Sequence, residues 1–166
     1  YFKKYLNKDY LYEVFKDDPY SDIHGDFTIE NIICMKKKNN KGKSFYIIDP
    51  NTGNVHDSPY LDYGKLFQSI HGGYEFLMNT KKVSYSEDKI EFLFTKSSTY
   101  YKLYDELVKY LEKKFGKDAL KSIFYHEIIH WLRLMPYKIE KNGERSLLFY
   151  AGLIMVASDV EERYEK

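Results

Sequence analysis

The chain has 166 residues, which is enough for one domain with a buried core. Apolar residues make up 43% of it and aromatic residues 18%, so it is not an intrinsically disordered segment. The formal net charge is +1, which predicts no general attraction to nucleic acid or to an anionic membrane surface. No apolar run is long enough for a membrane span. The single cysteine, Cys34, fits a reducing, cytoplasmic compartment.

The first third of the chain predicts one short helix followed by a β-hairpin. Apolar spacing favours a helix within residues 1–16, which ends before Pro19. Two short apolar runs, 31–35 and 45–48, flank the polar stretch 36–43, a pattern typical of a hairpin. The lysines of this connection are expected to form a solvated loop tip, with phosphate binding as the minor alternative.

The rest of the chain is predicted to be mainly helical, which gives an α+β fold with an early hairpin. Residues 82–96 are ambiguous between strand and helix. Expected helices cover residues 61–71, closed by Gly72-Gly73; about 100–115, stopped by Gly116; about 118–135, ending before Pro136; and about 146–164.

Oxygen-bearing side chains cluster around the predicted hairpin. Asp26 and Asn31 are separated by four residues, and Asp49 follows the second strand, which turns it back toward them. Phosphoryl transfer needs a carboxylate for the proton of the attacking hydroxyl, and oxygen ligands for the metal that binds the nucleotide phosphates. Mg²⁺ prefers such ligands. The simpler alternative is that Asp26 caps a turn, Asn31 begins a strand and Asp49 belongs to a Pro-Asn turn.

The segment His24-Gly25-Asp26, followed by Asn31 and Asp49, resembles the aminoglycoside phosphotransferase and choline kinase family. In that family the catalytic loop reads His-Gly-Asp, four residues and Asn, and a metal-binding Asp ends the following hairpin. The resemblance covers residues 22–66. It implies that Asp26 is the catalytic base and that Asn31 and Asp49 are Mg²⁺ ligands.

The resemblance also implies supporting roles for three neighbouring residues. Asp62, in the stretch Pro59-Tyr60-Leu61-Asp62, would hydrogen-bond the backbone of the catalytic loop and hold its shape. His24 would brace the same loop rather than act as a base. Asn51, two residues beyond Asp49, is a weaker candidate metal ligand.

The activity implied is ATP- and Mg²⁺-dependent phosphoryl transfer to a small-molecule hydroxyl, such as that of a sugar or an amino alcohol. Residues 1–166 would form the C-terminal lobe of a kinase-like fold, with a catalytic loop at 22–31, a metal-binding hairpin at 31–51 and a helical remainder. No Gly-rich phosphate loop is found. A missing N-terminal lobe or a fused domain, such as a nucleotidyltransferase, is therefore expected, and the isolated chain should be inactive.

Two other classes of function remain open. The motif His126-Glu127-Ile128-Ile129-His130 has the HExxH spacing of zinc hydrolases, in which two histidines share a helix face and the glutamate activates a water. The same residues also suit an ordinary packing helix. The third class is a non-catalytic, pseudokinase-like binding module. The residues that bind the acceptor are not specified by the sequence.

Overall fold

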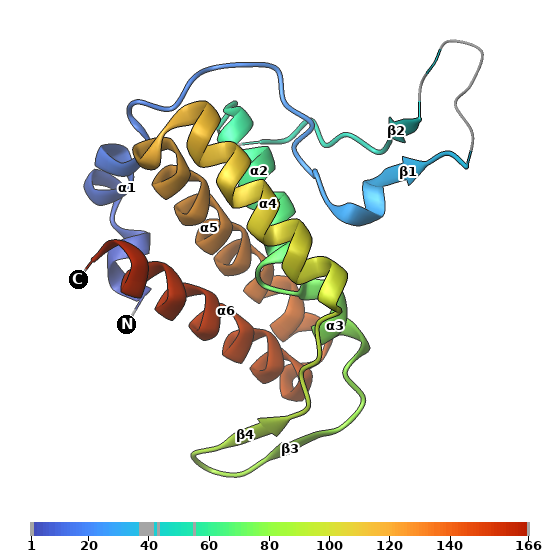
Figure 1. The fold of residues 1–166 in the computed structure, drawn as a ribbon. Coiled ribbons are helices and arrows are strands. Elements are labelled where there is room, and N and C mark those ends of the chain that lie inside the picture. Colours follow the sequence, from blue (N-terminus) through green and yellow to red (C-terminus); the bar gives the residue numbers. More distant parts are fainter. Residues whose placement is uncertain (1, 37–41, 43, 55, 166) are drawn as a thin grey trace.

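Helices dominate the structure, and two small antiparallel sheets of two strands each accompany them in the described part of the chain. The computed structural model describes all residues except 1, 37–41, 43, 55 and 166 (Figure 1). This arrangement confirms the expected α+β, mainly helical class. The elements are η1 (Phe2–Leu6), α1 (Lys8–Phe15), η2 (Ile29–Asn31), β1 (Ile32–Cys34), β2 (Phe45–Ile47), α2 (Pro59–Ile70), α3 (Tyr74–Asn79), β3 (Val83–Tyr85), β4 (Ile90–Phe92), α4 (Ser98–Phe115), α5 (Lys117–Lys141) and α6 (Gly143–Tyr164). Among the described helices, none is both long and apolar enough to cross a membrane.

Helix α5 forms the centre of the fold. It packs against α2, α4 and α6, and Figure 1 shows it running through the middle of the helical body. Its buried side chains include Ile123, Phe124, Ile128 and Trp131, which are fully enclosed by their neighbours. Burying a large apolar side chain contributes about 1.5–3 kcal/mol. The position of α5 therefore fixes the positions of the helices around it.

Helices α2 and α5 come into near backbone contact at Gly64. A Cβ atom added at this glycine would lie 2.6 Å from the Cβ of His126 and 2.9 Å from the backbone nitrogen of Glu127. Real Cβ atoms do not approach other atoms this closely. The glycine therefore lets α2 lie directly on α5, and it sets the position of the two polar residues beside it, Asp62 and Lys65.

The first hairpin extends away from the helical body (Figure 1), whereas strand β4 of the second contacts α6. The first confirms the hairpin predicted from the two apolar runs, and the second shows that the ambiguous stretch 82–96 contains a hairpin too. Most of the lysine-rich connection, residues 37–41 and 43, lies outside the described residues. The registers pair Ile32 with Ile47, Ile33 with Tyr46 and Cys34 with Phe45 in the first hairpin, and Val83 with Phe92, Ser84 with Glu91 and Tyr85 with Ile90 in the second.

The prediction that a helix ends before Pro136 is wrong, because α5 continues through this proline to Lys141. Proline removes one helical hydrogen bond. The Pro136 side chain is exposed, so its ring does not disturb the core. Beyond it, Lys138 anchors the last turns, because its Nζ donates to the Tyr74 hydroxyl at 3.0 Å and lies 4.2 Å from the centre of the Phe149 ring.

The helix expected within residues 1–16 is divided into η1 and α1. Asn7 separates them because its backbone is extended, and its side chain accepts a hydrogen bond from the amide of Tyr10 at 3.0 Å. This is an N-cap, which favours a new helix start at the next residue.

Candidate functional site

Asp62, near the start of α2, holds the loop of residues 22–31 through two backbone hydrogen bonds. Its carboxylate oxygens accept from the amides of His24 and Gly25, each at 2.7 Å. Ser58 caps the helix, because its hydroxyl accepts a hydrogen bond from an amide of the first turn. The structure thus places Asp62 where the resemblance put it, in contact with the backbone of the loop.

Gly25 lies directly against the segment after β2. Its φ angle is +78°, in the left-handed region that favours glycine. An added Cβ would lie 2.1 Å from the side-chain nitrogen of Asn54 and 2.4 Å from the carbonyl oxygen of Asn51. A side chain cannot be accommodated here, so the His-Gly-Asp segment needs its glycine for the loop to close against this segment.

His24 links the loop to the second strand. Its Nε2 lies 2.8 Å from the carbonyl oxygen of Ile48, and its Nδ1 accepts a hydrogen bond from the amide of Asp26 at 3.3 Å. These partners define the tautomer that carries its proton on Nε2. Both ring nitrogens are occupied within the protein, as a bracing residue requires.

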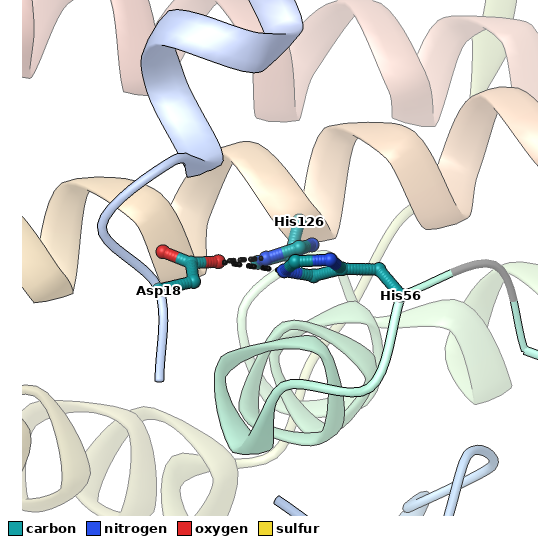
Figure 2. Close-up of side chains that lie close together, drawn as sticks. All are labelled: Asp18, His56 and His126. Carbon is teal, nitrogen blue, oxygen red and sulfur yellow. Dashed lines mark hydrogen bonds and ion pairs between the residues drawn. The ribbon is translucent and has the colours of Figure 1, made fainter. Parts of the chain in front are cut away.

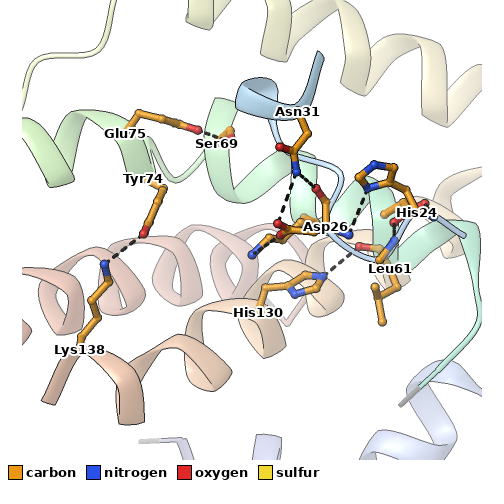
Figure 3. Close-up of polar contacts among 12 residues, drawn as sticks. His24, Asp26, Asn31, Leu61, Ser69, Tyr74, Glu75, His130 and Lys138 are labelled. Carbon is orange, nitrogen blue, oxygen red and sulfur yellow. Dashed lines mark hydrogen bonds and ion pairs between the residues drawn. The ribbon is translucent and has the colours of Figure 1, made fainter. Parts of the chain in front are cut away.

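Asp26 and Asn31 are joined directly (Figure 3). The side-chain amide of Asn31 donates to the backbone carbonyl of Asp26 at 2.8 Å and to its Oδ2 at 3.4 Å. Because the nitrogen of Asn31 faces Asp26, its side-chain oxygen faces another direction. The Asp26 side chain is 41% exposed, so a substrate can reach its carboxylate.

Lys65 was not among the predicted site residues. Its Nζ lies 3.3 Å from Oδ1 of Asp26. The signal that could have found it is its position three residues after Asp62, since this spacing on a helix places both side chains on one face. The site therefore contains a positive charge beside the proposed base.

Asp49 adopts an unusual backbone conformation. Its φ angle is +60°, the only positive value at a described residue other than glycine. The preceding residue, Ile48, donates its amide hydrogen to the carbonyl of Asn31 at 3.0 Å, so Asp49 is fixed close to that residue. Strained backbone of this kind costs about 1–3 kcal/mol and is concentrated at functional sites.

Asn51 supports the loop through its backbone. Its amide donates to the carbonyl of His24 at 2.8 Å. Its side-chain oxygen accepts a hydrogen bond from the amide of Gly53 at 3.3 Å, and its carbonyl accepts one from the side chain of Asn54. These contacts describe a local turn, which leaves Asn51 the weaker candidate for a metal ligand.

No protein-family model, curated protein or solved structure matches this chain. The interpretation of the site therefore depends on its own geometry and on the resemblance of its motifs.

The three polar residues of the HExxH motif have different partners. The Nε2 of His126 lies 2.7 Å from Asp18, a Glu127 oxygen lies 2.7 Å from the Nδ1 of His71, and the Nε2 of His130 lies 3.0 Å from the carbonyl of Leu61 (His130 and Leu61 in Figure 3). Burial, together with nearby positive charge, lowers the pKa of His130 to about 3. Across the described residues, the one cluster of three metal-ligating groups includes His126 but neither Glu127 nor His130.

His71, just after α2, lies between two carboxylates. Its Nδ1 is 2.7 Å from Glu127 and its Nε2 is 3.2 Å from Asp159. Burial lowers the pKa of this imidazole, but the two carboxylates outweigh it and raise the pKa to about 9. The interaction also lowers the pKa of Asp159. A protonated His71 thus joins the C-terminal end of α2 to the buried Glu127 of α5 and to the exposed Asp159 of α6.

This arrangement predicts that the His71 contribution to stability is lost in alkaline solution. The folded pKa of about 9 exceeds the ordinary value of 6.5, so the contribution is complete below 6.5 and disappears as pH rises through about 9. It amounts to on the order of 3 kcal/mol. Glu127, Asp159, Arg163 and Lys96 are the charged groups around it. Urea unfolding should show that the free energy of unfolding of the unchanged chain declines across this pH range and that of His71→Gln does not. If the free energies of the two proteins change with pH in parallel, the prediction is contradicted.

Proposed function

We propose that this chain is the catalytic lobe of an ATP- and Mg²⁺-dependent phosphotransferase that acts on a small-molecule hydroxyl. The observation that carries the proposal is the loop of residues 22–31. Asp62 binds its backbone, Asn31 binds Asp26 within it, and Asp49 follows the strand that pairs beside it. Positioning and charge account for most of the catalysis of phosphoryl transfer, so a rigidly held loop of this kind suits the reaction.

In this proposal Asp26 accepts the proton of the acceptor hydroxyl as that oxygen attacks the γ-phosphorus of ATP, and the bond from this phosphorus to the β,γ-bridging oxygen breaks to release ADP. Its carboxylate is exposed enough to meet the acceptor, and the amide of Asn31 orients it. Lys65, 3.3 Å from Asp26, supplies a positive charge near the transferred phosphoryl group. His24 and Asp62 hold the loop and take no part in the chemistry.

The residues present suit a Mg²⁺ ion. Asn31 offers a side-chain oxygen directed away from Asp26, and the exposed Asp49 offers a carboxylate. Both are hard oxygen donors of the kind that Mg²⁺ selects. When bound, the ion neutralises charge on the ATP phosphates. The positive φ of Asp49 supports a functional role, because backbone of this kind is concentrated at functional sites.

The proposal also includes a further protein part that covers the first hairpin. Apolar side chains on the first hairpin are exposed in the described structure, including Ile33 at 44%, Phe45 at 53% and Ile47 at 45%. An isolated two-stranded hairpin is marginally stable, and an exposed apolar patch marks an interaction surface. We propose that an N-terminal lobe or a fused domain, such as a nucleotidyltransferase, covers these apolar side chains. The same part would also complete the ATP site. The proposed activity belongs in the cytoplasm.

The test uses Mn²⁺ as a paramagnetic substitute for Mg²⁺, together with ATP. In amide NMR spectra, we expect signal broadening centred on Asn31 and Asp49, and we expect Asp49→Asn to remove it. Asparagine tolerates positive φ, so this variant keeps the backbone conformation while it loses the charge. Asp49→Gly should also abolish broadening while it preserves or raises the free energy of unfolding. Broadening that persists in both variants would refute the assignment.

Turnover separates the proposal from its alternatives. The isolated chain should show negligible ATP-dependent phosphoryl transfer, whereas the form that carries the N-terminal lobe should be active. A form with that lobe that binds Mn²⁺ and ATP but transfers no phosphoryl group to any sugar or amino alcohol would favour the non-catalytic module. The zinc hydrolase lacks comparable support, since His126 and His130 have separate partners.

A further inference from the structure

Two imidazoles and one carboxylate meet where three distant segments come together (Figure 2). Asp18 follows α1, His56 precedes α2, and His126 lies on α5. One ligand atom of each lies within 4.8 Å of the other two. The Nε2 atoms of His126 and His56 lie 2.7 Å and 3.4 Å from the same oxygen, Oδ2 of Asp18. Two ring nitrogens therefore converge on one carboxylate oxygen.

Neighbouring residues hold this cluster in place. The hydroxyl of Ser122 donates to the other oxygen of Asp18 at 2.6 Å, which leaves Oδ2 for the imidazoles. The ring of Phe15 stacks on His126 with centroids 4.1 Å apart. The Asp18 and His126 side chains are 3% and 4% exposed, and that of His56 is 39% exposed. The cluster is oriented from within the protein and is open on the His56 side.

We propose that Asp18, His56 and His126 bind a divalent transition-metal ion of the zinc class. Two imidazole nitrogens and one carboxylate oxygen are ligands that Zn²⁺ and its neighbours accept, whereas Mg²⁺ prefers oxygen alone. Tetrahedral Zn²⁺ with bonds of about 2.0–2.2 Å places its ligand atoms about 3.3 Å apart. The separation of 3.4 Å between His56 and Asp18 fits this geometry. The His126–Asp18 contact must lengthen by roughly half an ångström.

The site is separate from the proposed phosphoryl-transfer site, and the two proposals do not depend on each other. Asp18 and Ser122 also help line a pocket of about 660 Å³ beside α1. That lining includes neither Asp26 nor Asp49. A bound ion would tie the segment after α1 and the segment before α2 to α5, so metal binding should raise the thermal stability of the chain.

The test is a titration of the EDTA-treated chain with Co²⁺, whose visible absorption reports its coordination, followed by Zn²⁺. We expect one equivalent to bind, Zn²⁺ to displace Co²⁺, excess Mg²⁺ to have no effect, and Zn²⁺ to raise the melting temperature. His56→Ala and Asp18→Asn should each weaken binding at least about tenfold. His56 is partly exposed, so its removal should leave the fold intact, which circular dichroism of the metal-free variant verifies.

His130→Gln is the matched control, because His130 lies one turn beyond His126 on α5 and its ring contacts Leu61 instead. It should bind Co²⁺ as the unchanged chain does. Binding that survives His56→Ala and Asp18→Asn but fails in folded His130→Gln would overturn the proposal in favour of the HExxH site. Absence of both Co²⁺ absorption and a Zn²⁺-dependent change in melting temperature would overturn it altogether.

Discussion

Asp26→Asn is expected to reduce the proposed phosphoryl transfer by about 10²–10⁴-fold. Asparagine keeps the shape of the side chain but cannot accept the proton of the acceptor hydroxyl. The hydrogen bond from Asn31 to the Asp26 backbone carbonyl does not involve the carboxylate, so the loop should keep its conformation. Transfer from labelled ATP, measured in a form that carries the proposed N-terminal lobe, gives the rate, and calorimetry should show nucleotide affinity little changed.

Asp22→Asn is the matched control for this experiment. Asp22 is exposed and lies four residues before Asp26 in the same loop, so it carries the same change in charge without contact to the acceptor. It should retain nearly full activity. A fully active Asp26→Asn would show that this carboxylate is not the base. Equal losses in both variants would mean that the charge of the loop matters rather than one proton acceptor.

Gly64→Ala is expected to lower the free energy of unfolding by about 1–3 kcal/mol. The new methyl group would meet backbone atoms of His126 and Glu127 within about 3 Å, and backbone cannot rotate away as a side chain can. Helix α2 must then move off α5. Because α2 carries Asp62, the variant should also weaken the hold on the loop and lower Mn²⁺ affinity at Asp49. Urea unfolding and the Mn²⁺ titration measure the two effects.

Gly143→Ala provides the comparison. An added Cβ there meets nothing within 4 Å, and the residue lies at the first position of α6. The same chemical change should therefore be neutral or slightly stabilising. If both variants unfold at the same urea concentration, the close contact between α2 and α5 does not constrain the fold as we infer.

The sequence is most informative where the determining contacts are local. The first hairpin was predicted from two apolar runs around a polar connection, and its strands pair as expected. The spacing of Asp26 and Asn31 suffices to bring the two together, because only a short loop and one turn of η2 separate them. Pro136 shows the limit of such local rules, since packing beyond the proline keeps α5 helical.

Contacts between distant segments required the tertiary structure. The pairing of Asp62 with the loop was anticipated only through a family resemblance, and Lys65 was missed although it lies on the same helix. Nothing in the local sequence links Asp18, His56 and His126. Along the chain, His56 lies 38 residues after Asp18, and His126 lies 108 residues after it. The motif around His126 even suggested His130 as its partner instead.

The sequence by itself thus determined the mainly helical α+β class, the early hairpin and the order of the oxygen-bearing residues around it. Short-range spacing and apolar periodicity specify these features directly. Only the tertiary structure decided that α2 lies against α5 at Gly64, that His71 joins the buried Glu127 to the exposed Asp159, and that two histidines share the oxygen of Asp18. The physical reason is that packing of whole helices sets these contacts, and the direction of a buried side chain depends on every neighbour around it.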